Sequence, residues 1–225
     1  MWNLKKIIEM YQNKNYVYKY KEEYTRGIKF KNIRSRIIAT REKTIIKKFL
    51  AKILKNNSII IDIPCGTGKL GEVLNQFAIK ILAADISLPM MILAKEEYLP
   101  NKFIGFLRCD AQKIPLKDET IDIVICLRLF QRIPKNIRIN ILKEFYRISK
   151  NYLIISYSYS SPFQKIRRRI RKFYDKENPI FFSLDFNNIT LELKQAGFVI
   201  QDKKLVLPGL SSEVILLVQK LKNML

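Results

Sequence analysis

Residues 58–74 constrain the fold more than any other part of the 225-residue chain. Three consecutive isoleucines lead into Asp62, a pattern typical of a parallel strand that is buried on both faces. Gly66 and Gly68 then allow a sharp turn in which the backbone can approach a ligand, and the apolar spacing beyond them predicts a helix over residues 69–77. Because a helix N-terminus attracts anionic groups, this strand, turn and helix predict a nucleotide-type cofactor site.

The carboxylate that ends the strand narrows the choice of cofactor. Together with Gly71, the glycines satisfy G-x-G-x-x-G, a pattern that also occurs in dinucleotide-binding proteins. A carboxylate at Asp62 disfavours a pyrophosphate, but it suits a ligand with a cation close to its own carboxylate. S-adenosylmethionine is such a ligand, with an α-ammonium, an α-carboxylate and a sulfonium. A nicotinamide cofactor, and with it an oxidoreductase, is the alternative that Asp62 opposes.

Two further carboxylates follow at the ends of predicted strands. Asp85 ends an apolar run 17 residues after Gly68, close to the separation at which an acidic residue meets a ribose hydroxyl pair. Ile86 comes next, where its side chain can pack on an adenine face. A third predicted strand is followed by Asp110 and Ala111. Three carboxylates at the ends of three successive strands form one coherent set.

These motifs resemble those of the class I S-adenosylmethionine-dependent methyltransferases, of the small-molecule, UbiE-like domain type. The first motif of that family, an acidic residue followed after three residues by Gly-x-Gly, is matched from Asp62 to Gly68. The resemblance covers roughly residues 40–220 and implies S-adenosylmethionine as the cofactor, an Asp-Ala pair at the adenine and no metal. The residues expected to bind the cofactor are Asp62, Gly66, Gly68, Asp85, Ile86, Asp110 and Ala111.

The rest of the chain alternates between strand and helix patterns. Apolar runs predict strands at residues 79–85, 102–109, 121–126, 151–156, 198–206 and 213–219. Helical spacing predicts helices at residues 3–12, 40–54 with Thr40 as N-cap, 87–98 with Ser87 as N-cap, 135–149 and 187–196. The expected fold class is α/β, and the resemblance implies a Rossmann-like, seven-stranded, mostly parallel sheet with helices on both faces and an antiparallel last strand.

The positive charge is concentrated outside the predicted sheet. The chain has 42 Lys and Arg against 20 Asp and Glu, and residues 1–57 alone carry 16 basic and four acidic side chains. We predict a basic, Tyr-rich N-terminal arm over residues 1–40, a methyltransferase domain over residues 41–225, and a basic helical insertion near residues 159–184. The clustering favours an anionic partner or acceptor, and a general Lys-rich composition is the alternative explanation.

The predicted insertion has the pattern of a basic amphipathic helix. Such a helix can lie on an anionic membrane surface or track the phosphates of RNA, and it can equally be an ordinary surface helix. The cations available for such a contact are Lys165, Arg167, Arg168, Arg169, Arg171 and Lys172. The chain shows neither a secretory signal nor an apolar stretch of membrane-spanning length, so we expect a cytoplasmic protein that can lie at the inner face of a membrane.

The acceptor side of the site is less constrained by sequence. The chain contains no histidine, so a catalytic base, where the reaction needs one, would be another residue type, and none is assigned. Candidates for substrate contacts are Arg128 and Gln131 after the fourth strand, and Tyr24 in the arm. We predict methyl transfer to an anionic small-molecule, glycan or lipid-linked acceptor. The alternatives are an RNA methyltransferase and a non-catalytic module that binds nucleic acid or membrane.

Overall fold

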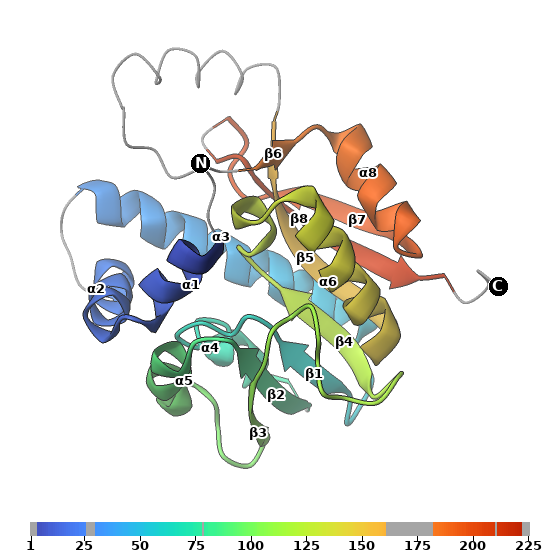
Figure 1. The fold of residues 1–225 in the computed structure, drawn as a ribbon. Coiled ribbons are helices and arrows are strands. Elements are labelled where there is room, and N and C mark those ends of the chain that lie inside the picture. The colour runs from blue at the N-terminus through green and yellow to red at the C-terminus, as the bar shows by residue number, and fades with distance from the viewer. Residues whose placement is uncertain (1–3, 26–29, 78, 161–181, 210, 222–225) are drawn as a thin grey trace.

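The protein folds around one mixed sheet with helices on both faces (Figure 1). The structure is a computed structural model that describes residues 4–25, 30–77, 79–160, 182–209 and 211–221. Most of the predicted basic insertion, including the six cations named above, lies outside the described residues. The α-helices are α1 (Leu4–Gln12), α2 (Lys14–Thr25), α3 (Phe30–Ile53), α4 (Gly71–Leu74), α5 (Leu88–Ala94), α6 (Lys135–Ile148) and α8 (Phe186–Gln195).

The sheet has the predicted architecture. Its strands are β1 (Ile59–Asp62), β2 (Lys80–Asp85), β3 (Phe103–Arg108), β4 (Ile121–Cys126), β5 (Ser149–Tyr159), β6 (Ser183–Leu184), β7 (Phe198–Leu205) and β8 (Glu213–Lys220). The order is β3-β2-β1-β4-β5-β8-β7, and the two-residue β6 pairs with β5 beside this path. β8 is antiparallel to both neighbours, whereas β1 to β5 pair in parallel. The Rossmann-like α/β prediction with an antiparallel last strand is confirmed.

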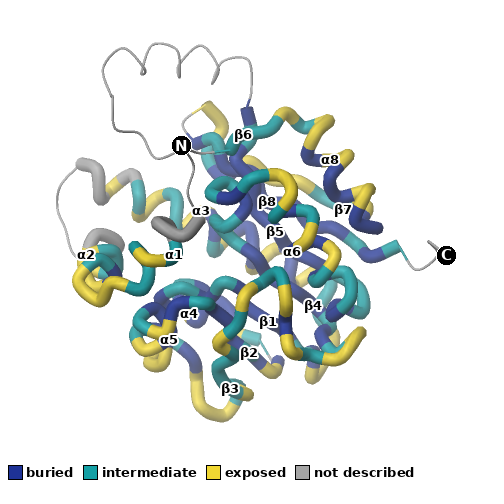
Figure 2. Tube along the Cα trace, in the orientation of Figure 1, coloured by how far each residue is buried: buried dark blue, intermediate teal, exposed yellow. Residues whose placement is uncertain are grey.

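Burial of β1 on both faces explains its unbroken run of isoleucines. Ile60 packs into the core on the side of α3 and α5, and Ile61 packs into the core on the side of α6 and α8; both are fully buried. Figure 2 shows the buried sheet between its more exposed helices. Since successive strand residues face opposite sides, a strand covered twice has no polar position available. Its first polar residue, Asp62, comes where the strand ends.

Three predicted helices have different bounds in the structure, among them the one predicted over residues 87–98, whose α-helical part, α5, ends at Ala94. α3 begins at Phe30, so Thr40 lies inside it and the predicted N-cap there is wrong. No Gly or Pro interrupts the chain over this span, and a helix continues until something stops it. The helix predicted over residues 69–77 is reduced to α4, because tight turns precede it: Gly71 donates its N–H to Gly68 and Val73 donates to Leu70. Ser87, in contrast, is the N-cap of α5, as predicted, and accepts from Met90 N–H at 3.2 Å.

The N-terminal helices α1 and α2 are attached to α5 and to the loop before it (Figure 1). Gln12 donates from Nε2 to the Ile86 carbonyl at 3.0 Å, and Ser87 donates from Oγ to the Tyr11 carbonyl at 2.5 Å. Val17 of α2 is 1% exposed. The Tyr-rich segment is therefore packed on the sheet domain beside the ends of β1 and β2. Among the helices that the structure describes, none is long and apolar enough to cross a membrane.

Candidate active site

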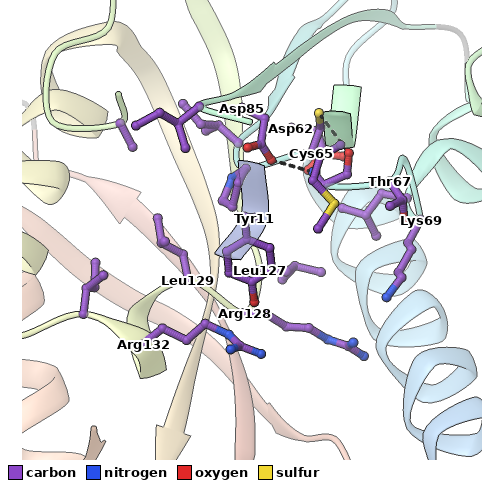
Figure 3. Close-up of a pocket in the computed structure, with 18 of the residues that line it drawn as sticks. Tyr11, Asp62, Cys65, Thr67, Lys69, Asp85, Leu127, Arg128, Leu129 and Arg132 are labelled. Atoms are coloured by element: carbon purple, nitrogen blue, oxygen red, sulfur yellow. Dashed lines mark hydrogen bonds between the residues drawn. The ribbon is translucent and has the colours of Figure 1, made fainter. Parts of the chain in front are cut away.

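A pocket opens where β1, β2 and β4 end, beside the N-terminal helices (Figure 3). The carboxyl ends of parallel strands are where ligands bind in folds of this type. In Figure 3 the carboxylates of Asp62 and Asp85 lie at one end of the pocket, and the guanidinium groups of Arg128 and Arg132 lie at the other. The predicted site residues among its lining are Asp62, Gly66, Asp85, Ile86, Asp110, Ala111 and Arg128.

Asp62 is held by a tyrosine from a distant part of the chain. Tyr98 donates from its hydroxyl to Oδ2 of Asp62 at 2.8 Å, and both side chains are buried. Burial raises the pKa of the Asp62 carboxyl from 3.8 to about 7; the hydrogen bond from Tyr98 opposes this rise, and the charge of Asp85 adds to it. A buried carboxylate that titrates near neutrality is suited to a cationic ligand, which would keep it ionised.

Asp85 joins the two turns that follow β1 and β2. Its Oδ2 accepts from Gly66 N–H at 2.9 Å and its Oδ1 accepts from Ser87 N–H at 2.8 Å. Burial raises the pKa of Asp85, and these two backbone hydrogen bonds lower it. A carboxylate has about four acceptor positions, so each oxygen can still accept from a ligand hydroxyl. The residue therefore shapes the glycine-rich turn and remains able to bind a diol.

The three glycines of the turn have three different surroundings. Gly66 has φ of +54°, and a Cβ built on it would meet nothing within 4 Å, so the space beside it is open to a ligand. Gly68, with φ of +75°, is absent from the pocket lining and lies against Glu97. At Gly71 a Cβ would come within 2.1 Å of the Glu97 carbonyl oxygen. The last two glycines thus serve close packing of the turn on the segment after α5.

The predicted adenine contacts lie together on the β2 and β3 side of the pocket. Ile86 and Ala111 are half-buried, and Asp110 is exposed. The Asp110 side chain accepts from the backbone N–H of Gln112 at 2.9 Å, which closes a local turn. This bond leaves further acceptor positions on the carboxylate.

The predicted substrate-side residues are placed differently from one another. Arg128 lines the pocket with its backbone at φ of +60°, and it donates from Nε and Nη2 to the two carboxylate oxygens of Glu42 at 2.9 and 2.5 Å. Gln131 is half-buried outside the lining, and its Oε1 has no hydrogen-bond partner among the described residues. Tyr24 belongs to α2, but its side chain lies outside the part of the chain that is described.

Several pocket residues were not singled out from the sequence. They are Tyr11, Tyr20, Glu42, Lys69 and Arg132. The alternation of tyrosines with lysines in α1 and α2 was a signal for the first two. Glu42 lies in α3, Lys69 in the glycine-rich turn and Arg132 at the end of the short 3-10 helix Phe130–Arg132, and no motif marks any of them. Tyr98, which holds Asp62, has no sequence signal either.

Sequence comparison finds known methyltransferases that are similar to this chain. Residues 61–154 match the family described as "Methyltransferase domain". The ubiquinone/menaquinone biosynthesis C-methyltransferase UbiE of Campylobacter jejuni (strain 81-176) is 29% identical, in an alignment that covers 78% of this chain and 84% of the relative. The malonyl-[acyl-carrier protein] O-methyltransferase of Marinomonas sp. (strain MWYL1) is 28% identical over 51% of this chain and 44% of the relative.

Structure comparison supports the same fold over nearly the whole chain. The magnesium protoporphyrin IX methyltransferase ChlM of Synechocystis PCC 6803, solved with bound SAH, superposes with a TM-score of 0.80 at 16% identity. The superposition covers 97% of this chain and 100% of that one. The fold, the glycine-rich turn and the sequence match together define a class I S-adenosylmethionine-dependent methyltransferase. The chain is an enzyme of this class, with S-adenosylmethionine as its cofactor.

Proposed function

We propose that the Asp62 and Asp85 end of the pocket binds S-adenosylmethionine and that the opposite end binds a small, anionic methyl acceptor. In this arrangement Asp62 accepts from the α-ammonium group, Asp85 accepts from the ribose hydroxyls, and Ile86, Asp110 and Ala111 contact the adenine. The observation that carries the proposal is the pair of buried carboxylates at the ends of adjacent strands, beside the open space at Gly66.

The chain's own contribution to the reaction is positioning and exclusion of water. The bound cofactor would supply a methyl group on a sulfonium, which has a good leaving group, so no protein nucleophile is needed. α1 is held beside the pocket by the bonds of Gln12 and Tyr11 to the Ile86 and Ser87 segment, and α2 follows directly after it. These bonds reach the two residues that follow Asp85. The same short segment therefore holds both the N-terminal helices and the residue proposed to contact the ribose. No described residue is assigned as a general base.

A small-molecule acceptor is favoured over RNA because the acceptor end of the pocket is enclosed by side chains of α1, α2 and α3. Tyr11, Tyr20, Ala39 and Glu42 come from these three helices. An anionic acceptor is favoured because Lys43, Lys69, Arg128 and Arg132 line the same region. An anionic acceptor group that is part of a glycan or a lipid also fits this site if its reactive end is narrow enough to enter the pocket.

Direct binding and transfer measurements test this function. We expect S-adenosylhomocysteine to bind the wild-type protein and Asp85→Ala to weaken that binding about 10- to 100-fold, since hydrogen bonds to a charged group contribute roughly 1.5–3 kcal/mol. Asp122→Ala is the matched control, because Asp122 also accepts a backbone N–H, from Ile59 at 2.8 Å, and lies outside the pocket. An unchanged dissociation constant in Asp85→Ala would remove this residue from the cofactor site.

The acceptor can be sought with extracts and a labelled methyl donor. Mass spectrometry of extracts that were incubated with the enzyme and isotopically labelled S-adenosylmethionine should show label in an acidic small molecule. Salt-sensitive binding to RNA or to anionic liposomes, without any binding of S-adenosylmethionine or S-adenosylhomocysteine, would contradict the proposal and favour a non-catalytic binding module.

A further inference from the structure

The first half of α3 lies outside the core that buries the second half. The buried side chains of this helix are Glu42, Ile45, Ile46, Phe49 and Leu50. Among the described side chains from Ile33 to Arg41, none is buried. Figure 1 shows this part of α3 away from the sheet, beside α2. Most helical stability in proteins comes from packing of an apolar face, and here the core covers only the second half of the helix.

Two isoleucines are exposed on the uncovered half of α3. Ile33 is 45% exposed and Ile37 is 48% exposed. They are four residues apart, so their side chains lie on the same face of the helix. Isoleucine forms helices less readily than leucine, glutamine or lysine, so helix formation does not explain this choice of residue. Neighbouring aliphatic side chains at a surface are typical of an interaction site.

The rest of the exposed face of α3 is basic. The helix contains eight Lys and Arg and one acidic residue, Glu42, which is buried and paired with Arg128. The exposed cations among the described side chains of α3 are Arg36, Arg41, Lys47, Lys48 and Lys52, and no described exposed side chain of this helix is acidic. Arg36 directly precedes Ile37, and Arg41 follows it by one helical turn. Cations therefore flank the apolar pair.

An anionic lipid bilayer is the partner that suits both features. Cations on one side of a helix are attracted to lipid phosphates, and aliphatic side chains on the same side enter the boundary between headgroups and acyl chains. A nucleic acid would attract the cations, but its phosphate surface offers no apolar layer to aliphatic side chains. The combination on α3 therefore favours a lipid surface over RNA.

We propose that the exposed face of the first half of α3, formed by Ile33, Arg36, Ile37 and Arg41, docks the protein on an anionic lipid bilayer. The opposite side of the same stretch lines the pocket through Ala39 and Glu42. Since a helix with its side chains is about 10–12 Å across, docking keeps the acceptor end of the pocket about one helix diameter from the lipid. The proposal is independent of the proposed function, because it concerns binding of a bilayer and not methyl transfer.

Vesicle sedimentation tests the docking. The probes are vesicles of phosphatidylcholine alone and vesicles of phosphatidylcholine and phosphatidylglycerol in about a two-to-one ratio. We expect the wild-type protein to bind the mixed vesicles about ten-fold or more tightly than the neutral ones. Because the formal net charge of the chain is +22, attraction to anionic vesicles does not by itself identify the surface, so matched variants are needed.

The isoleucine pair is tested by a polar and an apolar replacement. Ile33→Gln combined with Ile37→Gln should weaken binding to the mixed vesicles about ten-fold or more, since glutamine keeps the helix but not the apolar contact. Ile33→Leu combined with Ile37→Leu should bind like the wild type. Leu191→Gln is the matched control, because Leu191 is 61% exposed on α8, which packs on the other face of the sheet.

The arginine pair is tested against lysines elsewhere on the surface. Arg36→Gln combined with Arg41→Gln should weaken binding to the mixed vesicles roughly 10- to 30-fold, since one cation near an anionic surface contributes about five-fold. Lys143→Gln combined with Lys194→Gln removes the same charge from exposed positions of α6 and α8, and it should change the affinity less than about three-fold. Unchanged binding of S-adenosylhomocysteine in each variant would show that the fold is retained.

Hydrogen exchange locates the contact directly. On the mixed vesicles the amides of residues 33–41 should exchange more slowly, whereas those of α8 should not change. The proposal is overturned if the wild type does not bind the mixed vesicles, if the glutamine variant of the isoleucine pair binds them like the wild type, or if residues 33–41 gain no protection. Binding to RNA that depends on Arg36 and Arg41, with vesicle binding that does not, would also overturn it and favour a nucleic acid.

Discussion

Tyr98→Phe removes one hydroxyl, the donor of the 2.8 Å hydrogen bond to Oδ2 of Asp62. The ring of Tyr98 also stacks on Phe103, with 5.2 Å between centroids, and this packing survives the substitution. The change therefore isolates the hydrogen bond. Its effect should appear in the protonation of Asp62 and, through that, in the affinity for the cofactor's ammonium group.

The magnitude follows from the energy of a hydrogen bond to a charged acceptor. Such a bond contributes roughly 1.5–3 kcal/mol, and 1.36 kcal/mol corresponds to one pKa unit, so the substitution should raise the Asp62 pKa by roughly 1 to 2 units. The starting pKa is about 7. At pH 7 about half of the wild-type Asp62 is ionised, against roughly one tenth to one hundredth in the variant. We therefore expect cofactor binding about five- to fifty-fold weaker at pH 7.

The assay is the dissociation constant of S-adenosylhomocysteine measured between pH 6 and 8.5. Wild-type affinity should fall as the pH drops below about 7, because protonation removes the carboxylate that the ammonium needs. In Tyr98→Phe this fall should begin 1 to 2 pH units higher, with affinity partly restored at pH 8.5.

Tyr146→Phe provides the control. It also removes one hydroxyl, which donates to the Leu221 carbonyl at 2.9 Å, far from the pocket. A Tyr98→Phe variant with the wild-type affinity and the wild-type pH profile would refute the assignment of Asp62 to the ammonium group. A loss of affinity that does not change with pH would point to altered packing instead.

Three further predictions concern stability. Asp62→Asn should stabilise the cofactor-free protein more at pH 8 than at pH 5, which chemical denaturation at both pH values would show. The folded-state pKa of Asp62, about 7, is above the unfolded value of 3.8, so ionisation of this carboxyl lowers stability as the pH rises through that window. Arg138→Met should cost about 3–5 kcal/mol in urea unfolding, because it leaves Glu192 buried and unpaired, and adding Glu192→Leu should recover most of the loss. Gly71→Ala should cost about 1–3 kcal/mol and weaken cofactor binding, since its Cβ would overlap the Glu97 carbonyl oxygen; a wild-type melting temperature would contradict this.

Local sequence patterns predicted most of the sheet. A strand buried on both faces must be apolar throughout, so the isoleucines of β1 identify it without knowledge of its neighbours. The carboxylates of Asp62 and Asp85 likewise follow directly from strand ends, and the pocket includes both. Patterns failed where an element does not pack on the sheet: the first half of α3 has exposed positions such as Ile33 and Ile37, so its periodicity gave no sign of a helix start at Phe30.

The sequence by itself therefore determined the class of enzyme and its methyl donor, because the strand, the glycine-rich turn and the acidic residues proposed to bind such a donor follow in order within a short part of the chain. Only the tertiary structure decided the surroundings of these residues. Tyr98 reaches Asp62 across 36 positions, and Glu42 reaches Arg128 across 86. Charge balance and burial depend on such distant pairs, so the protonation of Asp62 and the cationic end of the pocket at Lys69 could be recognised only in the folded chain.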